Sequence, residues 1–334
     1  MFEQLREVIL EKIRQGIDPL GKIIGQEEAK EGILAALLVG HHILIEGPPG
    51  VGKTTLAKEV AKLLPPIKVV KGCPYNCDPE EPVCPLCKQK KDFEIEEIAG
   101  IKRFVRIQGS PDLTAEDLLG DIDPPMAFKY GPQDYRAFTP GKLLKGNRGV
   151  IFFDELNRVP EKLQNALLQV LEEGIATIGP YDVDYPSNFI MIATMNPAEH
   201  AGVEELSDVL LDRFDMVRMG HPVSIEEEKR IVLENARDIG VKVKPELMDE
   251  LLKIVRATRE DEEISQGASV RASISLYEKA QARALMHGRR EVTREDIMEM
   301  APSVLLKRIK PAPESPYFED PLPLVIRKID EVMG

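Results

Sequence analysis

The sequence contains no tryptophan, few other aromatic residues and no long apolar run. Aromatic residues make up 5% of the 334 residues. The longest apolar stretches, such as residues 33–39, are far shorter than the ~20 residues that a membrane-spanning helix needs. The N-terminal sequence MFEQLREVILEKIRQG places acidic residues within a 3.6-residue periodicity, which indicates an amphipathic helix and not a secretory signal. We therefore expect a cytoplasmic protein with no membrane association.

The sequence also lacks an excess of positive charge. It has 44 Lys and Arg against 57 Asp and Glu, for a net charge of −13. Such a surface repels phosphate backbones at long range, which argues against nucleic acid as a partner. Hydrophobic residues make up 43% of the chain, enough to form packed cores and to exclude a disordered protein. The length suggests two domains.

Strands and helices are predicted to alternate in the first two thirds of the chain. We expect apolar strands at residues 41–46, 67–71, 104–108, 149–153 and 189–194, with helical periodicity between several of them. This order predicts an α/β fold, in which helices cover both faces of a parallel sheet. After about residue 220 only helical patterns remain, which predicts a small all-helical domain.

These patterns suggest three regions. Residues 1–220 form the core domain, interrupted by a Cys-rich insertion at 72–100 and by a Gly- and Pro-punctuated insertion at 111–148. Residues 221–310 form the helical domain. Residues 311–334 form a Pro-rich C-terminal arm that docks on the body of the protein or on a neighbour.

A glycine-rich loop after the first strand carries the strongest chemical signal. Its sequence fits GxxxxGK[ST] in full, with a predicted strand before it and a helix after it. Glycines let backbone N–H groups converge on phosphate oxygens, and the helix N-terminus adds its positive dipole end. Lys53 would reach the β and γ phosphates of ATP, and the Thr54 hydroxyl would take a Mg²⁺ position. The predicted nucleotide-binding residues are Gly47, Pro48, Pro49, Gly50, Val51, Gly52, Lys53, Thr54 and Thr55.

Two carboxylates follow a second apolar strand, at Asp154 and Glu155. Burial of unpaired anions is costly, so carboxylates at the end of a buried strand need a partner. Beside a phosphate loop the partners would be Mg²⁺ and water. We expect Asp154 to hold the metal through water and Glu155 to polarise the attacking water.

All four cysteines lie within one short stretch, as Cys73, Cys77, Cys84 and Cys87. This grouping favours a structural Zn²⁺ site with four thiolate ligands. Two alternatives stay open: disulfide bonds, or thiols that bind no metal.

These motifs together resemble the AAA+ ATPases, and within them the branch of the magnesium chelatase I subunits and the MoxR-type ATPases. The similarity extends over roughly residues 20–310. Ile24-Gly25-Gln26 resembles the family's adenine-contacting segment, which implies nucleotide contacts for Gly25 and Gln26. The sequence around Asn196 resembles the sensor-1 strand, which implies that this amide positions water against the γ-phosphate. The sequence GASVRA around Arg271 resembles the sensor-2 motif, with valine where proline is usual.

Arg213, in the sequence LLDRFD, matches the arginine finger of the family, a residue that acts on the nucleotide of a neighbouring subunit. An intramolecular pairing of Arg213 with Asp212 or Asp215 is the alternative, and Arg218 is a weaker finger candidate. Asn196 could instead be a turn residue before Pro197, and Arg271 a solvated arginine at a helix start. Arg158 could face a subunit interface.

The resemblance implies a Mg²⁺-dependent ATPase that forms a ring, expected to be a hexamer, and remodels or loads a protein client. The adhesion-type (VWA) module of the branch would lie on a separate partner chain. Residues 111–148 resemble the helix-2 insert of the branch, and residues 174–188 its pre-sensor-1 hairpin. The aromatic residues at 128–138 would either grip a client or pack within the insert.

Two other functions stay open. One is an MCM-like nucleic-acid translocase, although residues 174–188 contain no Lys or Arg to bind phosphates. The other is a scaffold that binds ATP with negligible turnover. The sequence does not identify the client, nor whether a metal is inserted into a porphyrin-type ring.

Overall fold

The computed structural model describes residues 1–90, 92–132, 134–178, 183–196 and 206–334. Its contacts divide the chain into two units. The first unit comprises Met1–Ile23, Glu27–Gly47 and Gly52–Met219. The second comprises Ile24–Gln26, Pro48–Val51 and Gly220–Gly334.

The first unit is built on a five-stranded parallel sheet with the strand order β11-β1-β10-β7-β4. Its strands are β1 (His42–Glu46), β4 (Phe104–Gln108), β7 (Val150–Asp154), β10 (Ile190–Met195) and β11 (Phe214–Arg218). The central strands are buried on both sides, as their continuous apolar sequences predict. The edge strand β11 was not among the strands expected from the sequence.

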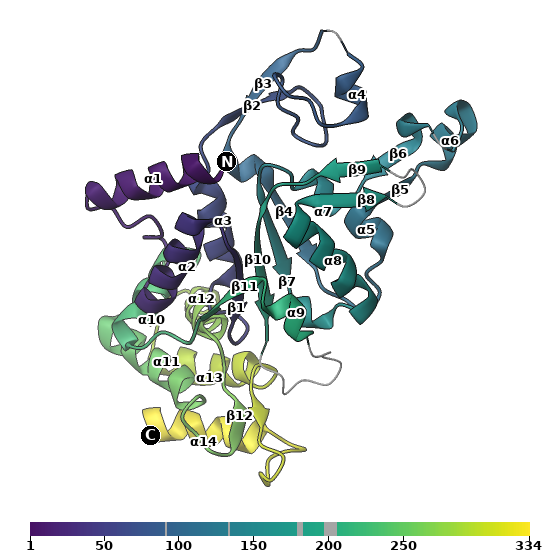
Figure 1. Cartoon of the computed structure of the whole chain (residues 1–334). Helices are drawn as coiled ribbons and strands as arrows, with labels where there is room; N and C mark the ends of the chain where they lie inside the picture. The colour runs from purple at the N-terminus through teal and green to yellow at the C-terminus, as the bar shows by residue number, and fades with distance from the viewer. Residues whose placement is uncertain (91, 133, 179–182, 197–205) are drawn as a thin grey trace. The chain divides into compact units, whose positions relative to one another are not determined.

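Helices cover both faces of this sheet (Figure 1). Helices α2 and α3 lie on one side, and α7 and α8 lie on the other. The parallel sheet with helices on both faces is thus confirmed. The helices of this unit are α1 (Phe2–Arg14), α2 (Glu27–Val39), α3 (Lys53–Leu63), α4 (Pro85–Lys88), α5 (Ala115–Leu119), α6 (Pro124–Tyr130), α7 (Lys142–Lys145), α8 (Glu161–Glu173) and α9 (Asp208–Leu211), with 3₁₀ turns η1 (Gly100–Arg103), η2 (Tyr135–Ala137) and η3 (Leu156–Arg158).

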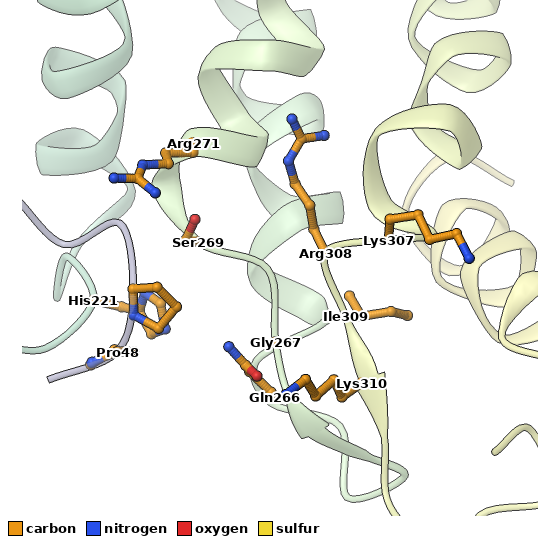
Figure 2. A pocket seen from close by; sticks show the side chains of 11 residues that line it. Pro48, His221, Gln266, Gly267, Ser269, Arg271, Lys307, Arg308, Ile309 and Lys310 are labelled. Carbon is orange, nitrogen blue, oxygen red and sulfur yellow. The ribbon is translucent and has the colours of Figure 1, made fainter. Parts of the chain in front are cut away.

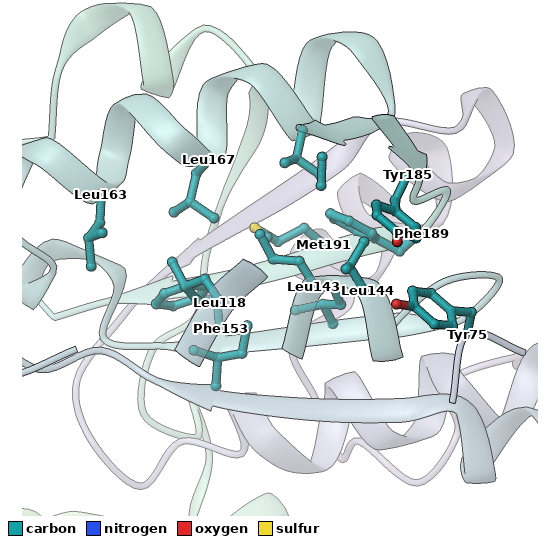
Figure 3. Close-up of a cluster of buried hydrophobic side chains, with 14 of the residues drawn as sticks. Tyr75, Leu118, Leu143, Leu144, Phe153, Leu163, Leu167, Tyr185, Phe189 and Met191 are labelled. Atoms are coloured by element: carbon teal, nitrogen blue, oxygen red, sulfur yellow. The ribbon is translucent and has the colours of Figure 1, made fainter. Parts of the chain in front are cut away.

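One apolar core fills the space between the sheet and helices α7 and α8 (Figure 3). Phe153 and Met191 contribute from the sheet, and Leu163 and Leu167 from α8. These leucines recur at helical spacing, which turns one stripe of α8 toward the sheet. The cluster also includes Tyr75 and three of the cysteines, so the Cys-rich insertion packs onto the core itself.

Three antiparallel pairs extend from this unit. They are β2 (Ile67–Val70) with β3 (Ile95–Ile98), β5 (Gly120–Ile122) with β6 (Phe138–Pro140), and β8 (Ile175–Ile178) with β9 (Val183–Pro186). The strand expected at 67–71 therefore forms, but it pairs with β3 and not with the main sheet. Strand β3 lies near the end of the Cys-rich insertion, and its Ile95 pairs with Val70 of β2.

The second unit is mainly helical and has its own apolar core. Its helices are α10 (Ile225–Asn235), α11 (Pro245–Ala257), α12 (Val270–Met286), α13 (Arg294–Leu305) and α14 (Leu322–Met333). A short antiparallel pair, β12 (Ile264–Gln266) with β13 (Lys310–Pro311), is an addition to the helical pattern expected from the sequence. The C-terminal helix α14 packs into this core through Leu324, Val325 and Ile329. Among the described residues, no helix combines the length and the apolar composition needed to cross a membrane.

Candidate functional site

The glycine-rich loop follows β1 and ends where α3 begins at Lys53, as the sequence predicts. Gly52 is the N-cap of α3, and no side chain caps this end of the helix. The N–H groups of the first helical turn therefore remain available to a ligand, and they favour an anion. Gly47 leaves no space for a side chain, because a Cβ there would lie 2.2 Å from the Met219 carbonyl oxygen.

Lys53 lies inside this loop and contacts the end of the neighbouring strand β10. It is only 7% exposed. Its ammonium donates to the Gly47 carbonyl at 2.5 Å and to Asn196 Oδ1 at 3.1 Å. Because β1 and β10 are parallel neighbours, the loop that follows β1 and Asn196, which follows β10, meet at the carboxyl ends of the strands.

Asn196 also contacts Glu155, so the structure links three of the predicted site residues in a row. Asn196 Nδ2 donates to Glu155 Oε1 at 3.2 Å. Glu155 has a left-handed backbone conformation (φ 57°), which is uncommon for a residue with a side chain. Its backbone N–H is held by the Thr194 hydroxyl at 2.9 Å. The backbone turn and the amide together fix the direction of this carboxylate.

Asp154 lies beside Glu155 and has two partners from neighbouring strands. The Thr194 hydroxyl donates to Asp154 Oδ1 at 2.9 Å, and Arg106 donates to Oδ2 at 2.6 Å. Thr54, at the start of α3, is half-buried, whereas Thr55 is exposed. A carboxylate and a hydroxyl are oxygen donors of the kind that Mg²⁺ binds.

Sequence reasoning missed four residues of this site: Thr194, Arg106, Gln108 and Gly109. Gln108 donates to Glu155 Oε2 at 3.0 Å. Its position follows from the register of β4 against β7, which pairs Gln108 with Asp154. The available signal was the spacing of Arg106 and Gln108. Residues two apart in a strand share one face of the sheet, so two polar side chains at this spacing indicate a polar site on that face.

The arginines considered as interface residues, Arg213, Arg158 and Arg218, have intramolecular partners; Arg218 pairs with Glu46 at 2.9 Å. Arg213 pairs with Glu172 at 3.1 Å, and neither Asp212 nor Asp215 is its partner in an ion pair. Its side chain is 33% exposed, and its Nε is buried with no hydrogen-bond partner among the described residues. Arg158 donates to Glu155 Oε2 at 3.0 Å.

In the second unit, Gln26 joins two segments that are far apart in the sequence. Its side-chain amide donates to the Gly220 carbonyl at 2.8 Å and accepts from the Gly220 N–H at 3.2 Å. Gly25 lies against the Glu227 carboxylate, which would be 2.9 Å from a Cβ at this position. The amide of Gln26, expected to contact adenine, is therefore engaged with backbone.

Arg271 lines a pocket of the second unit, at the start of α12 (Figure 2). The loop residues Pro48 and Pro49 line the same pocket, as do His221 and Ser269. Burial lowers the pKa of His221 to about 4, so its imidazole is neutral at pH 7. The basic residues of the lining are Arg271, Lys307, Arg308 and Lys310. This positive lining suits an anionic ligand.

The aromatic residues of the 111–148 insertion differ in their exposure. Phe128 is 96% exposed on α6. Tyr130 instead packs under the Arg136 guanidinium, 4.0 Å from its ring centre, and Tyr135 donates to Gln89. Phe138 is buried in the core. Among these aromatic side chains, Phe128 is the one that is fully open to a partner.

Comparisons with known proteins assign this site to a family. Family models match residues 88–216 (ATPase family associated with various cellular activities, AAA), 256–323 (AAA lid domain) and 19–72 (Magnesium chelatase, subunit ChlI). The magnesium-chelatase subunit ChlI homolog of Methanocaldococcus jannaschii is 30% identical over 91% of this chain and 88% of its own length. The chain belongs to the ChlI/MoxR branch of the AAA+ ATPases.

Other relatives of this AAA+ ATPase agree with the assignment. The chaperone MoxR1 of Mycobacterium tuberculosis is 30% identical over 86% of this chain and 72% of its own length. Among solved structures, a model of the complex between subunits BchI and BchD of magnesium chelatase matches with a TM-score of 0.50. It is 23% identical and covers 95% of this chain and 99% of that chain. The structural match supports the AAA+ fold.

Proposed function

We propose that this AAA+ ATPase is a Mg²⁺-dependent ATP hydrolase that assembles into a ring, a hexamer, and uses hydrolysis to remodel or load a protein client. AAA+ ATPases of this type use ATP and Mg²⁺, form ring oligomers and work with partner subunits. The observation that carries the proposal is the hydrogen-bonded row of Lys53, Asn196 and Glu155 at one edge of the sheet. It supports phosphate binding and water activation at adjoining positions.

The residues at the loop fit a nucleotide triphosphate with Mg²⁺. The uncapped N-terminus of α3 supplies N–H donors, and Lys53 supplies a positive charge directed into the loop. Asp154 and Thr54 would hold the metal, which when bound neutralises charge on the phosphates. Arg271, which lines a pocket with the loop residues Pro48 and Pro49, is the proposed sensor-2 contact to the phosphates.

Glu155 has the surroundings of a general base. It accepts hydrogen bonds from Asn196 at Oε1 and from Gln108 and Arg158 at Oε2, so both carboxylate oxygens are held in place. An ionised carboxylate held in a fixed direction orients a water molecule and accepts its proton. Asn196 contacts both Lys53 and Glu155, so it sets the spacing between the phosphate-binding side and the water-activating side of the site.

Arg213 would complete the site of a neighbouring subunit. Its ion pair with Glu172 is partly exposed to solvent, and such pairs contribute little to stability. The guanidinium can therefore leave Glu172 for a phosphate at low cost. An arginine supplied by a neighbour makes hydrolysis depend on assembly, because it contributes ~10³-fold or more to the rate.

A protein client suits this chain better than nucleic acid. Residues 174–188 contain no Lys or Arg, whereas phosphate contacts rely on these residues. Phe128, exposed on α6, is the candidate client contact. A VWA-type domain on a separate chain is the partner proposed from the branch, and insertion of a metal into a porphyrin-type ring is one candidate task. Stimulation of the ATPase by single-stranded DNA would instead favour the translocase.

Two substitutions test the proposed chemistry. Glu155→Gln keeps the shape of the side chain and removes its basicity, so we expect ATP binding with turnover reduced by ~10²–10⁴-fold. Lys53→Ala should lose ATP binding. Phosphate release from the assembled protein measures turnover, and a fluorescent ATP analogue measures binding. Glu7→Gln, on exposed α1, is the matched control and should behave as the wild type.

The result that contradicts this mechanism is normal turnover in Glu155→Gln. Negligible phosphate release by the wild-type protein would favour the scaffold instead. Because Glu155→Gln should hold ATP without release, the protein that co-purifies with it in ATP identifies the client.

A further inference from the structure

The four cysteines of the insertion converge although no disulfide joins them. Their sulfur atoms all lie within 4.8 Å of one another. Cys73 Sγ and Cys84 Sγ are 3.8 Å apart. Four sulfurs placed tetrahedrally at ~2.3 Å from one Zn²⁺ are separated by ~3.8 Å, so this spacing matches a single-metal site.

The surroundings of these sulfurs also suit a metal. Cys77, Cys84 and Cys87 are buried, and Cys73 is half-buried. The Cys84 N–H points at Cys77 Sγ and the Cys87 N–H at Cys84 Sγ, each at 3.4 Å. Such N–H groups stabilise charge on ligating sulfurs. Thiols are weak donors, so without a metal a buried cluster of them contributes little cohesion.

We propose that Cys73, Cys77, Cys84 and Cys87 bind one Zn²⁺, and that the metal-bound insertion braces the β5–β6 and β8–β9 hairpins against the sheet. As the metal binds, each thiol releases its proton to solvent and each sulfur donates an electron pair to Zn²⁺. Four thiolates close the coordination shell, so the role is structural and not catalytic.

The first half of the brace is a stack of three aromatic rings. Tyr75, between Cys73 and Cys77, stacks on Tyr185 of β9 with ring centres 5.5 Å apart and planes 9° apart. Phe138 of β6 stacks on the same Tyr185 at 5.7 Å. All three rings are buried, and Figure 3 shows Tyr75 and Tyr185 beside each other at one end of the core. The stack thus joins the insertion to both hairpins.

The second half of the brace consists of polar contacts. Beside the Cys84–Cys87 turn, Gln89 accepts a hydrogen bond from Tyr135, in η2 of the 111–148 insertion. Asn147, just before β7, donates to the Tyr75 carbonyl at 2.8 Å and accepts from the Asn188 N–H at 3.0 Å. A single amide therefore ties the cysteine-rich turn to the segment that leads into β10.

Regular secondary structure does little to make the Cys-rich insertion rigid. Between β2 and β3 the described residues form only the four-residue helix α4. A metal that fixes Cys73 and Cys87 would hold Tyr75 in place against Tyr185. Loss of the metal should therefore loosen both hairpins and not only the insertion.

Metal content provides the first test. Full-length protein purified without chelators or metal-affinity resin should carry about one Zn²⁺ per chain by plasma mass spectrometry, and Cys84→Ser and Cys87→Ser should lose it. Cobalt added to the metal-free protein should give the absorption of a tetrahedral thiolate site. Less than about a quarter equivalent of zinc, iron in its place, or disulfides found by intact mass would overturn the metal site.

Hydrogen exchange tests the brace separately, because Tyr75→Ala leaves all four thiols in place. We expect this variant to keep its zinc while amide exchange in residues 138–139 and 183–185 speeds by about tenfold or more. Tyr75→Phe, which preserves the ring, should exchange as the wild type does. Removal of zinc from the wild type should loosen the same residues. If zinc removal changes exchange only within residues 72–90, the brace is wrong. Neither readout depends on ATP hydrolysis, so this proposal can fail while the proposed function stands.

Discussion

Gly109, the residue that follows β4, lies directly against the backbone of the two site carboxylates. Its N–H donates to the Asp154 carbonyl at 2.7 Å. A Cβ at this position would lie 2.0 Å from the Glu155 carbonyl oxygen. The left-handed turn that directs Glu155 therefore depends on a hydrogen atom in place of a side chain at Gly109.

Gly109→Ala should reduce ATP turnover by more than about tenfold, because a displaced Glu155 loses its alignment with the water. The clash should also cost about 1–3 kcal/mol of stability. Phosphate release and a thermal melt measure the two effects. Gly220→Ala is the control, since a Cβ there meets nothing within 4 Å. If the two variants have the same turnover and the same stability, the backbone at Gly109 accommodates a methyl group and the prediction is wrong.

At the scale of single residues, the sequence motifs named residues of the candidate site that the structure brings together. Lys53, Asp154 and Glu155 belong to segments whose residue types follow from phosphate and metal chemistry. Arg106 and Gln108 were not predicted, because their roles depend on the register of β4 against β7. Strand register is a long-range property, and the local sequence of β4 does not contain it. The pairing of Arg213 with Glu172 was missed for the same reason.

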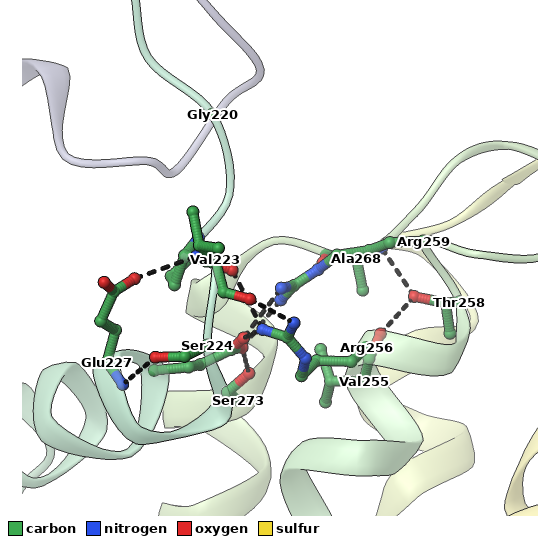
Figure 4. A network of polar contacts seen from close by, with 12 residues as sticks. Gly220, Val223, Ser224, Glu227, Val255, Arg256, Thr258, Arg259, Ala268 and Ser273 are labelled. Carbon is green, nitrogen blue, oxygen red and sulfur yellow. Dashed lines mark hydrogen bonds and ion pairs between the residues drawn. The ribbon is translucent and has the colours of Figure 1, made fainter. Parts of the chain in front are cut away.

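At the scale of elements, a buried carboxylate connects several segments of the second unit. Glu228 of α10 is completely buried and accepts from Arg259 at two distances of 2.8 Å. Figure 4 shows its partners Arg256, Arg259 and Ser273 close together. Ser273 of α12 donates to it at 2.5 Å. Arg256 of α11 is a further partner at 3.4 Å. The network joins three helices that are separate in the sequence.

Glu228→Gln should destabilise the protein by about 3–5 kcal/mol, because it leaves two guanidinium groups without their charge partner. Burial raises the pKa of Glu228, but the hydrogen bonds from Arg259 outweigh it and hold the pKa below its usual value. The folded protein therefore favours the ionised form. Its contribution to stability is present above about pH 4.5 and is lost as the pH falls further.

Urea denaturation at pH 7 and at pH 4 checks this expectation. The difference between wild type and Glu228→Gln should be smaller at pH 4. Glu226→Gln, on the exposed side of the same helix, should change stability by less than about 0.5 kcal/mol. If Glu228→Gln lowers the free energy of unfolding as little as Glu226→Gln does, the network does not stabilise the second unit.

Element types followed well from the sequence, and pairing partners did not. The apolar strands β1, β7 and β10 were predicted because buried parallel strands have continuous apolar sequences. Strand β2 was predicted as a strand, but its antiparallel partner β3 has the sequence IEEI and gave no apolar signal. Strand β11 is an edge strand of five residues in which Phe214 and Val217 are buried and the others are not, so its pattern is short and mixed.

At the scale of the whole molecule, the proposed finger predicts that hydrolysis needs two subunits. Arg213→Ala should bind ATP and hydrolyse it poorly, whereas Lys53→Ala should not bind ATP. Mixed together, they should regain activity, because an intact loop meets an intact finger at about a quarter of randomly formed interfaces.

Phosphate release from the separate and mixed variants measures this recovery. Arg218→Ala alone should hydrolyse ATP normally, since Arg218 pairs with Glu46 and is 82% exposed. If the mixture stays as inactive as its two components, Arg213 does not act across an interface. Poor hydrolysis by Arg218→Ala together with normal hydrolysis by Arg213→Ala would transfer the role to Arg218.

The pairing of Val70 with Ile95 has a consequence for how this protein could have arisen. The cysteine-bearing segment begins after Val70 of β2 and ends before Ile95 of β3, and these two residues are paired. The two ends of the segment therefore lie next to each other. A short turn in its place would keep the ends of β2 and β3 together but would remove Tyr75, so the β8–β9 hairpin would lose the ring that packs on Tyr185. Gain or loss of the cysteine-bearing segment could thus occur in a single genetic step.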